Sequence, residues 1–178
     1  GVFEDLTVAI FSGVILSLLI YTFESVKKVK VVELVYRDDG HWEIKPAPDK
    51  LTSNGITVIQ IYGNVFFADV YSADDLLPSY EEANNAVLIN SMRGRESLDL
   101  TRIEYIKKLS KKFKESGNHL ILCGVEETVL KQMKDGKLIE ALGEENVVPV
   151  QPIIGGSIML AYEKAQRWIE ENKSSLHN

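Results

Sequence analysis

Residues 6–23 (LTVAIFSGVILSLLIYTF) carry no charged side chain, and this uncharged run most constrains how the chain can fold. A helix of this length rises about 27 Å, close to the ~30 Å thickness of the hydrocarbon core of a bilayer. Apolar side chains would lie all round it, so none of its faces suits water. The run therefore predicts a membrane-spanning helix, with a buried core helix of a soluble protein as the alternative.

The two flanks of this run differ in charge. Glu4 and Asp5 precede it, whereas Lys27, Lys28 and Lys30 follow it. Because lysines beside a membrane span tend to stay in the cytoplasm, we expect the residues after the span on the cytoplasmic side. A secretory signal peptide would have basic residues before the apolar run and a small-residue cleavage site after it, and the sequence has neither.

The 178-residue chain has the composition of a globular protein, with 45% hydrophobic and 26% charged residues. This balance excludes a disordered chain, and the length suits one domain with a small appendage. The net charge of −6 gives no reason to expect a nucleic-acid partner. A single cysteine, Cys123, excludes an internal disulfide. The chain starts at Gly1 rather than Met, which suggests a piece of a longer protein.

Short strands alternate with helices after the lysines. Residues 31–37 and 41–45 flank the turn-forming Asp38-Asp39-Gly40, a pattern typical of a β-hairpin. Apolar, β-branched runs predict further strands over 56–62, 86–90, 120–123 and, at an edge, 147–150. Apolar residues at helical spacing predict helices over 65–71, 103–113, 126–133 and 158–168. This alternation predicts an α/β domain with a mostly parallel or mixed sheet.

The motifs of the common cofactor and metal sites are missing from the sequence, which has no P-loop, GxGxxG, HExxH or CxxC pattern. His41, His119 and His177 are scattered, and we expect surface histidines rather than metal ligands. Cys123 ends an apolar run with no histidine nearby, so a buried core thiol is expected rather than a nucleophile. No enzyme activity and no cofactor are predicted.

Gly155, Gly156 and Ser157 precede the last predicted helix. A helix N-terminus presents free amides and a positive dipole, so these residues are a possible contact for an anion or nucleotide. The alternative is a tight turn with Ser157 as the helix N-cap, and this interpretation is favoured.

The segment 90–104 (NSMRGRESLDLTRIE) joins a predicted core strand to an amphipathic helix. Ligands of open α/β sheets bind at such loops. Thr101 followed by Glu104 fits a capping box, which would account for both residues structurally. A cap that also serves as a modifiable hydroxyl is the other interpretation. A phosphate on Thr101 would be favoured by the helix dipole and opposed by Asp99.

These patterns resemble the STAS domain, which is shared by anti-sigma-factor antagonists and the cytoplasmic tails of SulP-type anion transporters. The segment 63–69 (GNVFFAD) is similar to the SulP pattern of a strand, Gly and then Leu-Phe-Phe-Ala. Leu98-Asp99-Leu100-Thr101 resembles the family's Ile-Asp-x-Ser/Thr loop. On this match Asp99 is the family's acid and Thr101 takes the place of the phospho-acceptor. The next residue, usually Gly in the family, is Arg102.

The resemblance implies a mixed sheet flanked by helices, preceded by one transmembrane helix. Residues 1–26 would be the last membrane helix of a SulP transporter and 27–178 its cytoplasmic STAS domain. The transporter would reside in the inner or plasma membrane, and the domain would regulate its transport of sulfate or bicarbonate. Its expected partners are the transporter's own membrane domain, a second copy in a homodimer, and lipid around residues 6–23. The alternatives are an anti-sigma-antagonist-like module switched by phosphorylation at Thr101 and, less favoured, a nucleotide-binding surface.

Overall fold

The computed structural model describes residues 1–26, 30–37, 39–62 and 76–175. The predicted helix over 65–71, the motif over 63–69 and the side chains of Lys27, Lys28 and His177 lie outside the described residues. Contacts divide the chain into two units, which are described separately: 1–31 with 61–76, and 32–60 with 77–178.

Helix α1 (Val2–Val26) contains the uncharged run of the first unit. Its segment Val2–Glu24 has a mean hydropathy of 2.2 and none of it is buried. Large apolar side chains such as Phe11, Leu18 and Phe23 are exposed, and apolar residues lie on every side of the helix. This helix is long and apolar enough to cross a membrane. Its full exposure argues against the alternative of a buried core helix.

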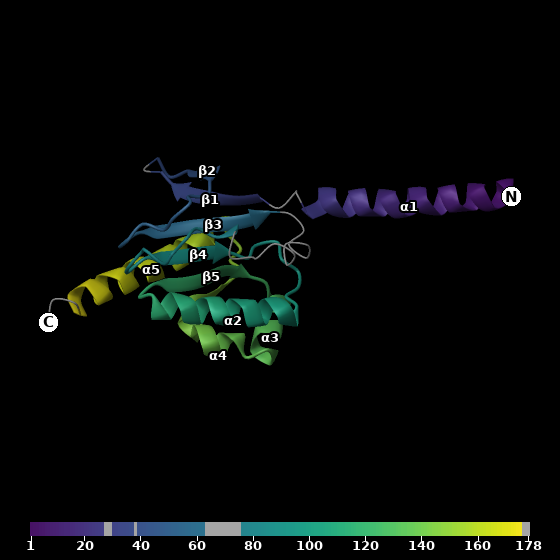
Figure 1. The fold of residues 1–178 in the computed structure, drawn as a ribbon. Coiled ribbons are helices and arrows are strands. Elements are labelled where there is room, and N and C mark those ends of the chain that lie inside the picture. The colour runs from purple at the N-terminus through teal and green to yellow at the C-terminus, as the bar shows by residue number, and fades with distance from the viewer. Residues whose placement is uncertain (27–29, 38, 63–75, 176–178) are drawn as a thin grey trace. The chain divides into compact units, whose positions relative to one another are not determined.

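A six-stranded mixed sheet forms the framework of the rest of the chain (Figure 1). The strands lie in the order β2-β1-β3-β4-β5-β6. Strands β3 to β6 pair in parallel, whereas β1 and β2 form the predicted antiparallel hairpin. Their bounds are β1 (Lys30–Tyr36), β2 (Trp42–Pro46), β3 (Ile56–Tyr62), β4 (Val87–Ser91), β5 (His119–Val125) and β6 (Val147–Pro149).

Helices cover both faces of this sheet. The bounds are α2 (Leu100–Glu115), α3 (Glu127–Asp135), α4 (Leu138–Leu142), the 3₁₀ turn η3 (Glu144–Asn146) and α5 (Gly156–Ser175). Alternate residues of a strand point to opposite faces, so Val87 and Ile89 pack towards α5 while the equally buried Leu88 points to the other face, where α2 lies. This confirms the predicted mixed α/β sheet flanked by helices.

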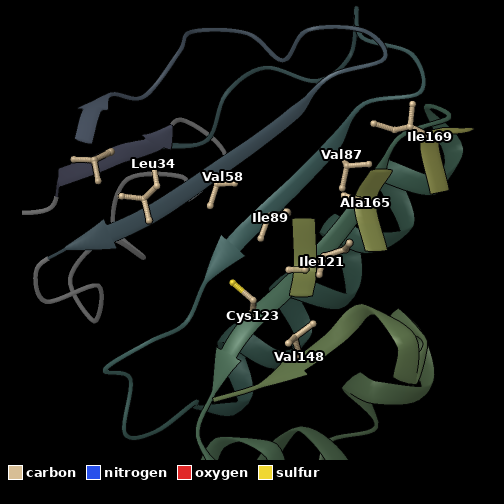
Figure 2. Close-up of a cluster of buried hydrophobic side chains, with 11 residues drawn as sticks. Leu34, Val58, Val87, Ile89, Ile121, Cys123, Val148, Ala165 and Ile169 are labelled. Carbon is tan, nitrogen blue, oxygen red and sulfur yellow. The ribbon is translucent and has the colours of Figure 1, made fainter. Parts of the chain in front are cut away.

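The core on the α5 face is built from short and β-branched side chains (Figure 2). Ala161 and Ala165 of α5 are fully buried, and their small side chains let the helix approach the sheet closely. Opposite them, Val58, Ile89 and Ile121 stand side by side on three neighbouring strands, as the register of the parallel pairs requires. The predicted apolar stripe of the last helix is therefore confirmed.

Candidate functional site

The loop after β4 lies at the carboxyl edge of the parallel strands, where α/β proteins bind ligands. Two backbone bonds fix its beginning: Met92 N–H donates to the Cys123 carbonyl at 2.7 Å, and Arg95 N–H to the Met92 carbonyl at 3.1 Å. Gly94 at φ +80° permits this turn. The loop is therefore joined to the neighbouring strand β5 as soon as it leaves β4.

Helix α3 holds the other end of the same loop. The Leu98 N–H donates to the side-chain oxygen of Gln132 at 2.7 Å, and the Thr128 hydroxyl donates to the Glu96 carbonyl at 3.2 Å. Because both ends are bonded to neighbouring elements, the position at which helix α2 begins is fixed by the fold.

Asp99 is the N-cap of α2. Its backbone is extended, with ψ 166°, and its Oδ1 accepts from the Arg102 N–H at 2.8 Å. Leu98 before it and Ile103 after it are both buried, which fits a hydrophobic staple between positions N′ and N4. An apolar residue, then Asp, then an apolar residue four positions on is a sequence pattern that could have identified this cap.

The predicted capping box of Thr101 and Glu104 is wrong. Helix α2 begins at Leu100, so Thr101 lies inside the first turn and not at the cap. Glu104 instead bonds to Lys107 Nζ at 2.6 Å, one helical turn further on. Both Asp99 and Thr101 are good capping residues, and the fixed start of the helix selects Asp99.

The predicted regulatory residues Asp99, Thr101 and Arg102 all lie in this first turn. Thr101 is exposed, and its modification stays a prediction. Arg102 is largely buried and its Nε lies 3.4 Å from Asp99 Oδ2. Half-buried Arg95 adds a second cation: burial, and then the charge of Arg102, lower the pKa of its guanidinium, which still stays charged. A phosphate on Thr101 would gain from the helix dipole and be repelled by Asp99.

Gly155, Gly156 and Ser157 all form hydrogen bonds within the protein. The Ser157 hydroxyl donates to the Pro149 carbonyl at 3.1 Å and accepts from the Gln151 N–H at 3.0 Å. It thereby fastens the loop after β6 to α5. Ser157 is not the N-cap, because the helix begins one residue earlier, at Gly156. Contact of an anion or nucleotide with these residues stays a prediction.

Cys123 and His41 match their predicted environments, whereas His119 does not. Cys123 is fully buried, and burial raises the pKa of its thiol to about 12. His41 is exposed beside Asp39. His119 is half-buried: its ring stacks on Trp168, and its Nε2 lies 2.7 Å from Asn146 Oδ1. In the described part of the chain, no three His, Cys, Asp or Glu side chains are grouped as metal ligands would be.

His119 also lines a hollow of about 570 Å³ at the amino ends of β4 and β5, together with Asn84, Asn118, Asn146 and Trp168. The side-chain amides of Asn118 and Asn146 bond within the protein, whereas the buried Oδ1 of Asn85, which also lines the hollow, has no hydrogen-bond partner. Asn118 donates to the carbonyls of Tyr80 and Ala83, and Asn146 donates to the carbonyl of Leu142. Sequence reasoning did not identify this group, because its members come from four segments distant along the chain.

Comparison with known proteins identifies one matching family, the STAS domain, over residues 47–172. No match was found among curated protein sequences. A structure of SLC26A9 is similar with a TM-score of 0.55 and 16% identity, covering 91% of this chain and 28% of that one. A second structure is that of the murine solute carrier 26 family member A9 anion transporter in the inward-facing state. It is similar with a TM-score of 0.56 and 18% identity, covering 89% of this chain and 25% of that one. The chain thus spans about a quarter of these structures, and at such identity the likeness concerns the fold.

Proposed function

Because this chain belongs to the STAS-domain family, we propose that it is the last membrane helix and the cytoplasmic regulatory domain of a membrane transporter for an inorganic anion. The observation that carries the proposal is the joining, in one chain, of an uncharged helix long enough to cross a bilayer and a STAS domain. The likeness to the fold of two solute carrier 26 structures supports the same conclusion. Sulfate and bicarbonate are the anions that we propose.

In this proposal residues 1–26 are the last membrane helix of a SulP-type transporter, surrounded by lipid at residues 6–23. Residues 27–178 are its cytoplasmic domain, because the lysines that follow the helix favour the cytoplasmic side. The protein would reside in the inner or plasma membrane. The domain's partners would be the membrane domain of the same transporter and a second copy.

The test is deletion of residues 31–178 from the parent transporter, followed by uptake of labelled sulfate and labelled bicarbonate. We expect uptake to fall or the oligomeric state to change, at equal amounts of protein in the membrane. As a matched control, Lys131→Glu changes one exposed side chain of α3 and should leave both uptake and the oligomeric state unaltered. Unchanged uptake together with an unchanged oligomeric state after the deletion would refute a regulatory role.

A phosphorylation switch at Thr101, as in anti-sigma-factor antagonists, is the second candidate function. The exposed hydroxyl of Thr101 in the first turn of α2, beside Arg102, favours it. Thr101→Glu should change uptake by the parent transporter, whereas Thr101→Ala should preserve the unmodified level. Equal uptake by both variants and the wild type would exclude the switch.

A further inference from the structure

Strand β2 lies at one edge of the sheet and leaves its outer side open. It is first in the strand order, and among the described residues only β1 pairs with it. Ile44, at its centre, is 61% exposed. An open edge with an exposed apolar residue can accept another strand, so the chemistry of this edge decides which strand would fit.

The backbone groups that face outward follow from the pairing of β2 with β1. The Arg37 N–H donates to the His41 carbonyl at 2.9 Å, so these residues form a hydrogen-bonded pair next to the turn. Bonded and non-bonded pairs alternate along an antiparallel ladder, and Ile44 opposite Leu34 therefore belongs to a non-bonded pair. Its N–H and C=O point away from β1, as do the N–H and C=O of Trp42 and the C=O of Pro46.

The sequence of β2, Trp-Glu-Ile-Lys-Pro, is complementary to itself about Ile44. In an antiparallel pair of two such strands centred on Ile44, Glu43 of each copy lies opposite Lys45 of the other. Pro46 of each copy then lies opposite Trp42. Opposite charges directly across a strand pair stabilise it, whereas like charges in these positions would destabilise it.

We propose that β2 pairs edge to edge with β2 of a second copy of this chain, antiparallel and with a twofold axis at Ile44. The two Ile44 residues exchange two backbone hydrogen bonds, and each Trp42 N–H donates to a Pro46 carbonyl of the other copy. The missing N–H of proline therefore costs only one bond at each end. This inference deepens the proposed function and rests on it, since it names the surface through which the regulatory domain contacts its second copy.

The same features disfavour a strand of unrelated sequence. Lys45 and Pro46 are typical of edge strands that avoid indiscriminate pairing, because each penalises a generic apolar neighbour. In the self-pairing each has a partner that suits it. Ile44 and Trp42 lie on one face of β2, and the two Ile44 side chains would become cross-strand neighbours there, which removes exposed apolar surface from water.

Charge reversal tests this pairing in the whole chain, purified in detergent, with self-association measured by sedimentation over a range of concentrations. Glu43→Lys places Lys against Lys45, and Lys45→Glu places Glu against Glu43, so each should weaken association about tenfold. The double variant E43K/K45E restores opposite charges and should regain it. A mixture of the two single variants should form heterodimers.

Helix α1 is identical in all these variants, so any association through it is a constant background. Lys131→Glu on the exposed surface of α3 is the matched charge control and should associate like the wild type. In a second test, Ile44→Cys should give disulfide-linked dimers on mild oxidation, whereas Glu127→Cys, also exposed, should not. The native Cys123 is buried and does not interfere.

Undiminished association of both single variants overturns this interface, as does a double variant that fails to regain association. The interface is also overturned if the wild-type chain stays monomeric, both alone and in the parent protein. The open edge of β2 would then be available to a strand of another protein. Failure of this interface can be distinguished from failure of the proposed function. If deletion of residues 31–178 lowers uptake, the domain is regulatory even where β2 does not pair with a second copy.

Discussion

The imidazole ring of His119 lies nearly parallel to the indole ring of Trp168, with the ring centroids 4.6 Å apart and the planes at 13°. Asn146 Nδ2 donates to the Leu142 carbonyl, which turns Oδ1 of Asn146 towards His119. His119 Nε2 therefore carries the proton in this contact. Burial, and to a lesser degree Lys114, lower the pKa of His119 from its ordinary 6.5, while Asn146 and Glu145 oppose the shift.

This lowered pKa predicts that acid destabilises the domain. Between the folded-state pKa of His119 and 6.5, the unfolded chain binds more protons than the folded chain. The free energy of unfolding should therefore fall as the pH is lowered from about 6.5. His119→Phe keeps an aromatic ring on Trp168 and should flatten this dependence in denaturant melts between pH 7.5 and 5.5. The exposed His41→Gln should not, and equal slopes in wild type and His119→Phe would refute the assignment.

The cap of α2 predicts unequal effects of two neighbouring substitutions. Asp99→Ala removes the acceptor of the Arg102 N–H and should lower the free energy of unfolding by about 1 kcal/mol. Thr101→Ala changes an exposed hydroxyl and should stay within about 0.5 kcal/mol of the wild type. Thermal unfolding of both variants provides the measurement. A loss at Thr101 as large as that at Asp99 would restore the capping box of Thr101.

The strands and the packed face of α5 could be predicted because local pattern determines them. The run 56–62 is mostly β-branched and forms β3, which is buried at residues 57–59, and Ala161 and Ala165 recur at helical spacing and face the sheet. The short helix α4 was missed, since five residues carry too little periodicity and the preceding Lys137 has a positive φ of 57°. Its start depends on a local backbone conformation that the residue type does not indicate.

The candidate site was predicted in its members but not in its geometry. Asp99, Thr101 and Arg102 do lie together, because they are close in sequence. Which of them caps α2 depends on the bonds from Leu98 to Gln132 and from Thr128 to Glu96, which join segments far apart along the chain. The stacking of His119 on Trp168 likewise depends on where α5 crosses the sheet.

Gly124 is predicted to be the least replaceable glycine near the loop after β4. Its φ is +68°, and an added Cβ would lie 3.3 Å from the backbone N and from the Cβ of Arg93. Gly124→Ala should therefore cost more than the ~1–2 kcal/mol of a left-handed conformation alone. Gly94→Ala is the matched control, because its φ is +80° and nothing lies within 4 Å of its added Cβ. If urea unfolding shows that Gly124→Ala and Gly94→Ala lower the free energy of unfolding equally, the close approach to Arg93 contributes nothing.

Asn118 is predicted to hold the segment before β4 to the start of β5. Its side chain is 1% exposed; Oδ1 accepts from the Ala86 N–H at 3.0 Å, and Nδ2 donates to the carbonyls of Tyr80 at 3.0 Å and Ala83 at 2.9 Å. Asn118→Ala would leave these buried groups without that partner and should cost about 3 kcal/mol.

Hydrogen exchange gives a site-specific measurement of the same effect, because the Ala86 amide loses its acceptor in Asn118→Ala and should exchange faster. Ser116→Ala is the control: its half-buried hydroxyl bonds to the Phe113 carbonyl and to Asn118, and its loss should cost about 1 kcal/mol and leave the Ala86 amide protected. Unchanged exchange at Ala86 in Asn118→Ala would show that another group can satisfy this amide, and the proposed role of Asn118 would fail.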